Sequence, residues 1–237
     1  ALSVSGGTAT LASATPTAIF QNGNSYTLSF SLTGTPDGSE VISVAPIANS
    51  VYDGSGNLAS TTQAKGSGKL MDKASPSISS VSLAADNSSI AVSFSENVFN
   101  TASGSGALEA SDFALSVSGG TATLASATPT AIVQNGNSYT LSFSLTGTPD
   151  GSEVISVAPI ASSVYDGSGN LASTTQAKGS GKLMDQASPS ISSVSLAADN
   201  SSIVVSFSEN VFNTASGSGA LEASDFALSV SGGAATL

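Results

Sequence analysis

Residues 78–94 read ISSVSLAADNSSIAVSF, two runs of alternating apolar and small polar residues on either side of an Asp-Asn pair. Alternation with a period of two is typical of a β-strand that buries one face, and Asp and Asn are common in tight turns. We therefore expect one strand over residues 78–83 and a second in which Ile90, Val92 and Phe94 point inward. This stretch predicts antiparallel β-structure.

The same alternation recurs along the chain, and signals for long helices are nearly absent. Seven or eight strands are expected in each repeating unit, separated by turn residues about every ten positions. Beyond the two above, strands are expected at 113–117, ending at Gly119-Gly120, through Thr123, at Ile132 before the Asn135-Gly136 turn, at 139–145, at 154–160 and at 171–177, with one helical turn in ALEASD at 107–112.

The chain repeats itself with a period of 113 residues. ALSVSGGTATLASATPTAI begins at Ala1 and again at Ala114, and ALSVSGG returns at Ala227. Comparison of residues 1–124 with 114–237 gives five mismatches: Phe20 with Val133, Asn49 with Ser162, Lys73 with Gln186, Ala91 with Val204 and Thr121 with Ala234. A unit of this length is enough for one domain with its own core, so we expect a tandem array of near-identical domains.

The composition excludes several classes of function. The chain has no Cys, His, Trp or Arg, and its net charge is −11. Nucleic acids and anionic membrane surfaces attract clustered Lys and Arg, so neither is an expected partner. No apolar run approaches the roughly 20 residues of a membrane span. The absence of Cys leaves the redox compartment open, and the acidic balance favours cations.

A Pro-marked acidic junction occurs once in each period, as MDKASPSI at 71–78 and MDQASPSI at 184–191, each after a loose QAKGSGKL stretch. We place the domain boundaries there: 1–71 is the C-terminal part of one module, 72–184 is a complete module, and 185–237 is the N-terminal part of the next. The strand pattern predicts an immunoglobulin-like Greek-key β-sandwich, with a small β-barrel as the alternative. Because 185–237 carries the strands that 1–71 lacks, we expect copies of this chain to complete one another head to tail.

The motifs also carry a family resemblance. SIAVSFSENVF, SDFALS, GNSYTLSFSLTGTPDGSE and VYDGSGNLAS occur in this order after the D-x-x-x-P of Asp72 and Pro76. The chain resembles the bacterial immunoglobulin-like repeats of very large surface proteins, including adhesins and swimming-motility surface proteins, and the likeness covers the whole period. The resemblance implies a secreted, cell-surface location and an extender or adhesive role, without catalysis.

Acidic residues are expected to meet at the junction between modules. In an immunoglobulin-like sandwich the chain start and two of the loops share one end, which here holds Asp72, Glu96 and Asp166. The preceding module would present Asp37 and Glu40 toward the same place. The next junction repeats the pattern with Asp185, Glu209, Asp150 and Glu153.

Such a cluster without Arg or His favours a hard cation. Two carboxylates about 4 Å apart repel by roughly 4 kcal/mol at an effective dielectric of about 20. Calcium takes six to eight oxygen ligands and tolerates irregular geometry. The loop from Asp53 to Asn57 and its copy at 166–170 also have oxygen-bearing residues at positions one, three and five, although the Gly and Glu of an EF-hand are missing. Equally, these acids are turn residues that could be solvated and well separated.

Two classes of function remain. The repeats could extend a stalk or filament, either as single chains or as like chains side by side, or they could be binding modules that recognise a glycan or protein. Glycan sites usually stack sugars on exposed aromatic rings, and this chain has no Trp and four Tyr. Near-identical copies also suit a protein that gains length by adding equal units. We therefore expect a structural extender stiffened by calcium at its junctions, and not an enzyme.

Overall fold

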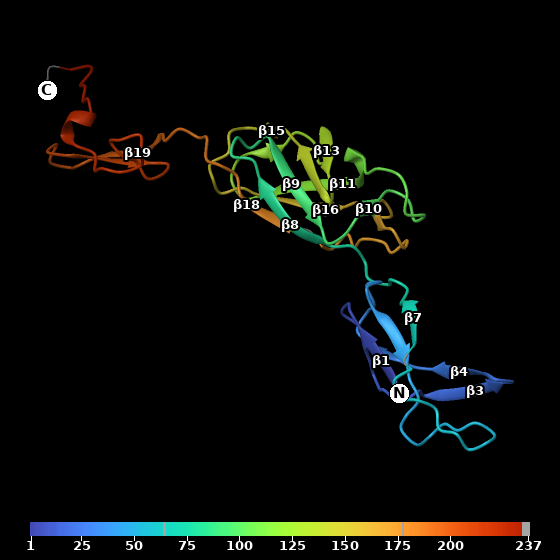
Figure 1. Ribbon diagram of the computed structural model, residues 1–237. Coiled ribbons are helices and arrows are strands. Elements are labelled where there is room, and N and C mark those ends of the chain that lie inside the picture. The colour runs from blue at the N-terminus through green and yellow to red at the C-terminus, as the bar shows by residue number, and fades with distance from the viewer. Residues whose placement is uncertain (64, 177, 234–237) are drawn as a thin grey trace. The chain divides into compact units, whose positions relative to one another are not determined.

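The computed structural model describes residues 1–63, 65–176 and 178–233 (Figure 1). The chain divides into two units, Ala1–Asp185 and Gln186–Leu237. Every described element is a strand except two three-residue 3₁₀ helices, η1 (Ala110–Asp112) and η2 (Ala223–Asp225). The prediction of an all-β protein is confirmed.

The first sheet of residues 72–184 is built around the two strands of the 78–94 stretch. It has four antiparallel strands in the order β13-β14-β9-β8. Their bounds are β8 (Ile78–Leu83), β9 (Ser89–Phe94), β13 (Ala131–Asn135) and β14 (Ser138–Ser142). On β9 the side chains of Ile90, Val92 and Phe94 are buried, as the alternation predicts.

The second sheet of this region has three antiparallel strands in the order β11-β16-β18, and among the described residues it shares no ladder with the first. Its strands are β11 (Phe113–Ser118), β16 (Val154–Pro159) and β18 (Lys178–Lys182). Two short ladders complete the region, β10 (Val98–Phe99) with β17 (Tyr165–Asp166) and β12 (Thr123–Leu124) with β15 (Leu145–Thr146).

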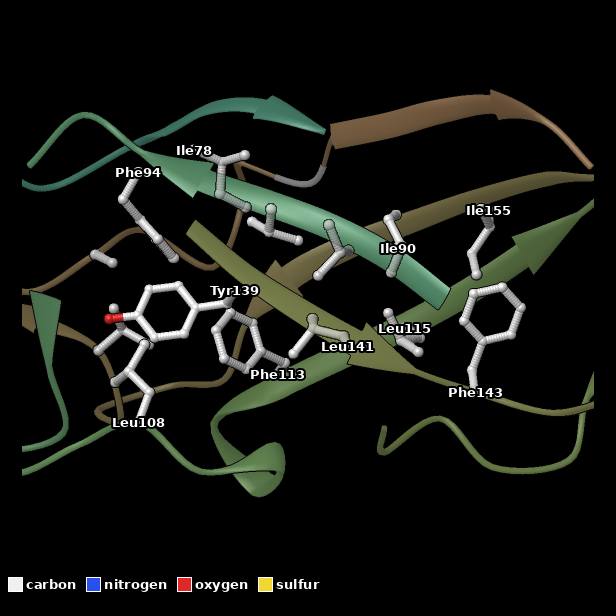
Figure 2. Packing of buried hydrophobic residues seen from close by; sticks show 14 of the residues in the cluster. Ile78, Ile90, Phe94, Leu108, Phe113, Leu115, Tyr139, Leu141, Phe143 and Ile155 are labelled. Carbon is white, nitrogen blue, oxygen red and sulfur yellow. The ribbon is translucent and has the colours of Figure 1, made fainter. Parts of the chain in front are cut away.

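The core contains residues from both sheets. The rings of Phe94, Phe113 and Tyr139 meet with centroids 6.0 to 6.2 Å apart, and Phe94 stands edge-on to Tyr139 at 83° (Figure 2). The buried Tyr139 hydroxyl donates to the Val98 carbonyl at 3.4 Å and accepts from the Gln134 side chain at 3.1 Å. The aromatic centre is therefore both packed and hydrogen-bonded.

The last strand of this region lies later in the chain than the sequence pattern predicts. It puts that strand at 171–177, where residue 177 lies outside the described residues and Leu171 forms an isolated bridge with Tyr165. The last strand is β18, inside the stretch taken to be loose, and a β-bulge interrupts its pairing with β16. The described residues of this region form seven strands of five or six residues and four of two residues.

Residues 1–71 repeat the back half of this arrangement. β1 (Leu2–Ser5), β6 (Val41–Val44) and β7 (Lys65–Lys69) form a three-stranded sheet in the order β1-β6-β7, which copies β11-β16-β18. β3 (Ala18–Asn22) and β4 (Ser25–Ser29) form a hairpin, and β2 (Thr10–Leu11) pairs with β5 (Leu32–Thr33). The second unit holds the hairpin β19 (Ile191–Leu196) and β20 (Ile203–Phe207), a copy of β8 and β9.

Candidate metal centre

Three carboxylates meet at one end of the 72–184 module. Asp72 precedes β8, Glu96 follows β9 and Asp166 belongs to β17, and one carboxylate oxygen of each lies within 4.8 Å of the others. Asp166 is buried, and Asp72 and Glu96 are half-buried. No other such group of acids occurs among the residues that the structure describes. The turn interpretation, in which these acids are well separated, does not hold for this trio.

Asp166 is fixed by its own loop. Its Oδ1 accepts from the backbone N–H groups of Ser168 at 2.8 Å and Asn170 at 2.7 Å, and its Oδ2 accepts from the Asn170 side chain at 2.7 Å. The Asn170 amide also donates to the backbone carbonyl of Asp72 at 3.3 Å. The D-x-x-G-N sequence therefore holds one acid rigidly and ties it to the backbone of a second.

The same loop geometry occurs without a cluster around it. Asp53 accepts from the backbone of Ser55 and Asn57 and from the Asn57 side chain, each at 2.8 Å. The loop conformation is thus set locally by an Asp that caps its own turn. The gathering of three acids at Asp166 is a separate, long-range feature, because it needs the two strands that bring Asp72 and Glu96 to this end.

The trio places strong like-charge repulsion on Glu96. Burial is the largest cause that raises the pKa of Glu96, followed by the carboxylates of Asp166, Asp72 and Asp37, and together they bring it to about 7. A carboxyl group with this pKa is half-protonated near neutral pH. A bound cation would remove the repulsion and favour the ionised form.

The loop of the preceding repeat lies against this trio. The carbonyl of Pro36 accepts from the backbone N–H of Lys73 at 2.8 Å and of Ala74 at 3.1 Å. Gly38 packs so closely that a Cβ there would lie 3.1 Å from the Cβ of Asp72. Because Lys73 contributes its backbone, the Gln that replaces it in the next copy can make the same contact.

Glu40 and Glu153, two of the acids predicted for the junctions, have a different role. Each is fully buried. Glu40 Oε1 accepts from the N–H groups of Thr8 at 2.9 Å and Ala9 at 2.8 Å, and its Oε2 accepts from Asp37 at 3.1 Å. These backbone donors, with that of Ala9 first, hold the pKa of Glu40 below its usual value despite its burial. Glu40 therefore shapes the loop that presents Asp37.

Glu153 repeats this arrangement with Thr121, Ala122 and Asp150 as donors, at 2.8, 2.8 and 3.0 Å. Burial opposes its ionisation, but the backbone donors outweigh that effect and lower its pKa. Gly120 is required here, since it has a φ of +56° and a Cβ would lie 2.2 Å from the Glu153 carboxyl carbon. The Gly-Gly pair ends β11 because it must pass over this buried carboxylate.

At the second predicted junction, Asp150, Glu153 and Asp185 belong to the unit Ala1–Asp185. Gly151 approaches Asp185 as Gly38 approaches Asp72, with a Cβ-to-Cβ separation of 3.2 Å. Asp150 caps its own turn through the N–H of Ser152 at 2.9 Å. Glu209 is exposed and belongs to the unit Gln186–Leu237. The meeting of Glu209 with Asp185 stays a prediction.

Two polar side chains make long-range contacts that the sequence pattern does not predict, and these contacts close the module. Gln176 accepts from the Ile78 N–H at 2.8 Å and donates to the Pro76 carbonyl at 3.2 Å, fixing the start of β8. Asn87 donates to and accepts from the backbone of Met184, at 2.8 and 2.9 Å. Both pairs join residues about a hundred positions apart, so no local pattern reveals them.

Comparison with known proteins gives no match. No family model, no curated protein and no solved structure matches the chain. Among the residues that the structure describes, no helix has the length and apolar character needed to cross a membrane. The repeat itself and the geometry of the junction are thus the features that point to a function.

Proposed function

We propose that this chain is a run of immunoglobulin-like extender modules from an extracellular bacterial surface protein, and that calcium stiffens the junctions between modules. The observation that carries the proposal is that Asp72, Glu96 and Asp166 meet where the loop at 36–38 of the preceding repeat is hydrogen-bonded to the module. A cation at this place would contact the end of one module beside the loop of its neighbour.

The strand order supports the finer assignment of the fold. A constant-type immunoglobulin domain has strands A, B, E and D in one sheet and C, F and G in the other. Here β8, β9, β14 and β13 occupy one sheet and β11, β16 and β18 the other, and their chain order corresponds to A, B, E, D and C, F, G. The tandem Greek-key sandwich is therefore the proposed architecture.

The donor set suits calcium. The trio offers carboxylate oxygens without nitrogen or sulfur ligands, and Asp37 adds a fourth negative charge nearby. Hard divalent cations prefer such oxygens, and extracellular calcium sites work with dissociation constants of about 0.1 to 1 mM. Asp72, Glu96 and Asp166 would hold the ion, and Asp37 would add to the negative field that attracts it.

The aromatic residues support a structural role over glycan binding. Tyr139 is 1 % exposed and lies in the core. Tyr165 is half-buried, and its hydroxyl donates to the Ser162 carbonyl at 3.2 Å. Neither tyrosine of the 72–184 module is among its exposed residues, whereas a ring that stacks on a sugar must be exposed.

Thermal unfolding of the whole chain in calcium and in chelator tests the proposal. At a free calcium concentration ten times the dissociation constant, binding stabilises the native module by about 1.4 kcal/mol, which raises the melting temperature by a few degrees. Glu96→Gln should abolish this increase, whereas Glu109→Gln, at an exposed acid outside the trio, should keep it. An identical melting temperature for the wild type in calcium and in chelator would refute the calcium proposal.

A further inference from the structure

Three of the four sheet edges in the described part of the 72–184 module are protected against pairing with another chain. β8 and β18 each carry a β-bulge. Along β11 the Leu115 N–H donates to the Ala127 carbonyl at 2.7 Å, so a loop occupies that edge. Bulges and covering loops are common devices that keep the edges of a sheet from pairing. The fourth edge is β13, at the end of the first sheet.

β13 has none of these protections. Its five residues, AIVQN, include no charged residue and no Pro, and they pair with β14 in an unbroken register. Among the described residues no strand pairs along its other side. A straight, uncharged strand edge is a template for a further strand.

The hydrogen-bond pattern shows which backbone groups this edge offers. The Thr130 N–H donates to the Ser142 carbonyl at 2.8 Å, so the even-numbered residues of β14 direct their backbone groups toward β13. Their register partners are the odd-numbered residues of β13. Because the bonds of an antiparallel ladder alternate, the backbone N–H and C=O groups of Ile132 and Gln134 point to the open edge.

The sheet behind this edge is uncharged in an acidic chain. β8, β9, β13 and β14 contain no charged residue, whereas the rest of the 72–184 module holds eight acids and three Lys. A net charge of −11 makes two copies of the chain repel each other. The edge of this sheet is therefore where a second copy meets the least opposition.

Hydroxyl groups of this sheet are already paired within it. The Ser93 and Ser138 hydroxyls share a hydrogen bond of 2.9 Å, and the Ser79 hydroxyl donates to the Ser93 carbonyl at 3.0 Å. At the start of β13 the Thr130 hydroxyl donates to the Ser142 carbonyl at 3.2 Å. These groups keep their partners when water is displaced, which lowers the cost of covering the sheet.

The middle of the edge is apolar. Val133 is the central residue of β13 and is 65 % exposed, the highest value among the large apolar residues described in the 72–184 module. Its copy in β3 is Phe20, which is 70 % exposed. This position is one of the five that differ between the repeats, and both occupants are apolar. An apolar side chain at mid-edge gains free energy from contact with another one across a strand pair.

We infer that β13 pairs antiparallel with β13 of a second copy of this chain, so that the four-stranded sheets of two modules join into one. Antiparallel pairing of identical edges is self-complementary, with a two-fold axis through its middle. In the register centred on Val133, the backbone groups of Ile132 bond to those of Gln134 in the second copy. The two Val133 residues then form a non-hydrogen-bonded pair, with Cα atoms about 4.5 Å apart. The contact holds extender chains side by side and does not depend on calcium.

Cysteine cross-linking of the whole chain tests the pairing. The chain has no Cys, so Val133→Cys introduces a single thiol, and a Cα separation of about 4.5 Å at the two-fold axis permits a disulfide. In oxidised glutathione, Val133→Cys should form a covalent dimer at least about tenfold faster than Ser82→Cys, because pairing raises the effective concentration of the thiols. Ser82 is the matched control, since it is exposed and lies on β8, the opposite edge of the same sheet.

Ala131→Cys and Asn135→Cys test the register. Both positions are exposed, and each lies away from the two-fold axis, so each variant alone should cross-link slowly. An equal mixture of the two should form a covalent heterodimer rapidly, because position 131 of one copy lies opposite position 135 of the other. A mixture that cross-links no faster than its components would contradict this pairing.

Hydrogen exchange of the wild type tests the contact without any substitution. The amides of Ile132 and Gln134 should exchange more slowly as the protein concentration rises. Val133→Lys, which places a charge at mid-edge, should remove this dependence, and Ser82→Lys should keep it. Exchange that is independent of concentration in the wild type, or cross-linking at position 82 as fast as at position 133, would overturn the inference.

Discussion

Replacement of Glu153, a fully buried acid, should destabilise the 72–184 module strongly. Its carboxylate accepts three backbone hydrogen bonds, from Thr121, Ala122 and Asp150. Glu153→Ala removes both acceptor oxygens and so breaks all three bonds, and an unsatisfied buried donor costs about 1 to 3 kcal/mol. The Ala122 bond is buried and the other two are partly buried, so we expect a total loss of about 3 to 5 kcal/mol.

Glu153→Gln separates the hydrogen bonds from the charge. Its carbonyl oxygen can still accept from Thr121 and Ala122, but its NH₂ group would face the N–H of Asp150. We expect a loss of about 1 to 2 kcal/mol, because one donor is left unsatisfied and the two remaining bonds no longer have a charged acceptor. The Glu residue has a lowered pKa in the folded state, so its contribution is present above the unfolded-state pKa of about 4.5 and is lost as the pH falls through the folded-state pKa. In Glu153→Gln this contribution to the loss of stability at low pH should be absent.

Urea denaturation of the whole chain at pH 7 and pH 4, followed by tyrosine fluorescence and circular dichroism, measures these differences. Glu109→Gln provides a control for the change of an exposed acid. If Glu153→Ala unfolds within about 0.5 kcal/mol of the wild type, which is typical of a surface substitution, then the three backbone bonds do not stabilise the module and the role assigned to Glu153 is wrong.

Three further changes test the core, the junction and the closing contact. Phe94→Ala should cost about 3 to 5 kcal/mol in urea denaturation because it empties part of the aromatic centre, whereas Ser93→Ala should cost about 1 kcal/mol or less; equal losses would contradict the strand phase. Without calcium, the raised pKa of Glu96 means that its protonated form favours folding, so stability should fall as the pH rises from about 4.5 through about 7. Glu96→Gln should remove that slope and stabilise the chelated protein at pH 8 by about 1 kcal/mol, after allowance for solvent screening; a slope unchanged in the variant would show that another group causes it. Gln176→Ala should cost about 1 to 2 kcal/mol and speed hydrogen exchange at the Ile78 amide, and unchanged exchange there would argue against the contact.

The sequence predicts the parts of the fold that depend on local alternation. Ile90, Val92 and Phe94 alternate with small residues, and β9 follows that pattern. The 3₁₀ turn at Ala110–Asp112 follows the sequence pattern in the same way, because it depends on neighbouring residues. The tight turn after β13 lies one residue later than predicted: Asn135 is the last residue of that strand and pairs with Ser138, and residues 136–137 form the turn, with Gly136 at a φ of +60°. In β18, by contrast, Lys and Gly have low strand propensity, and the strand forms because the backbone of β16 supplies hydrogen-bonding partners.

The candidate site shows the same division. Asp72, Glu96 and Asp166 are far apart in sequence, and their proximity follows once a topology is assumed, because that topology places the chain start and two loops at one end. The burial of Glu40 and Glu153 was not readable, since an acid after Pro-Asp-Gly-Ser resembles a solvated turn residue. Two of the three backbone N–H groups that bind each acid lie about thirty positions earlier, and a backbone group leaves no signal in the sequence.

Small-angle X-ray scattering with and without calcium tests the central claim, an extender whose junction is stiffened by the ion, most directly. The wild-type chain is measured at low concentration, beside the same chain with Glu96→Gln. We predict that calcium increases the radius of gyration and reduces the flexibility of the wild-type chain, and that Glu96→Gln shows the chelated behaviour in both buffers. Superimposable profiles of the wild-type chain in calcium and in chelator would contradict the account.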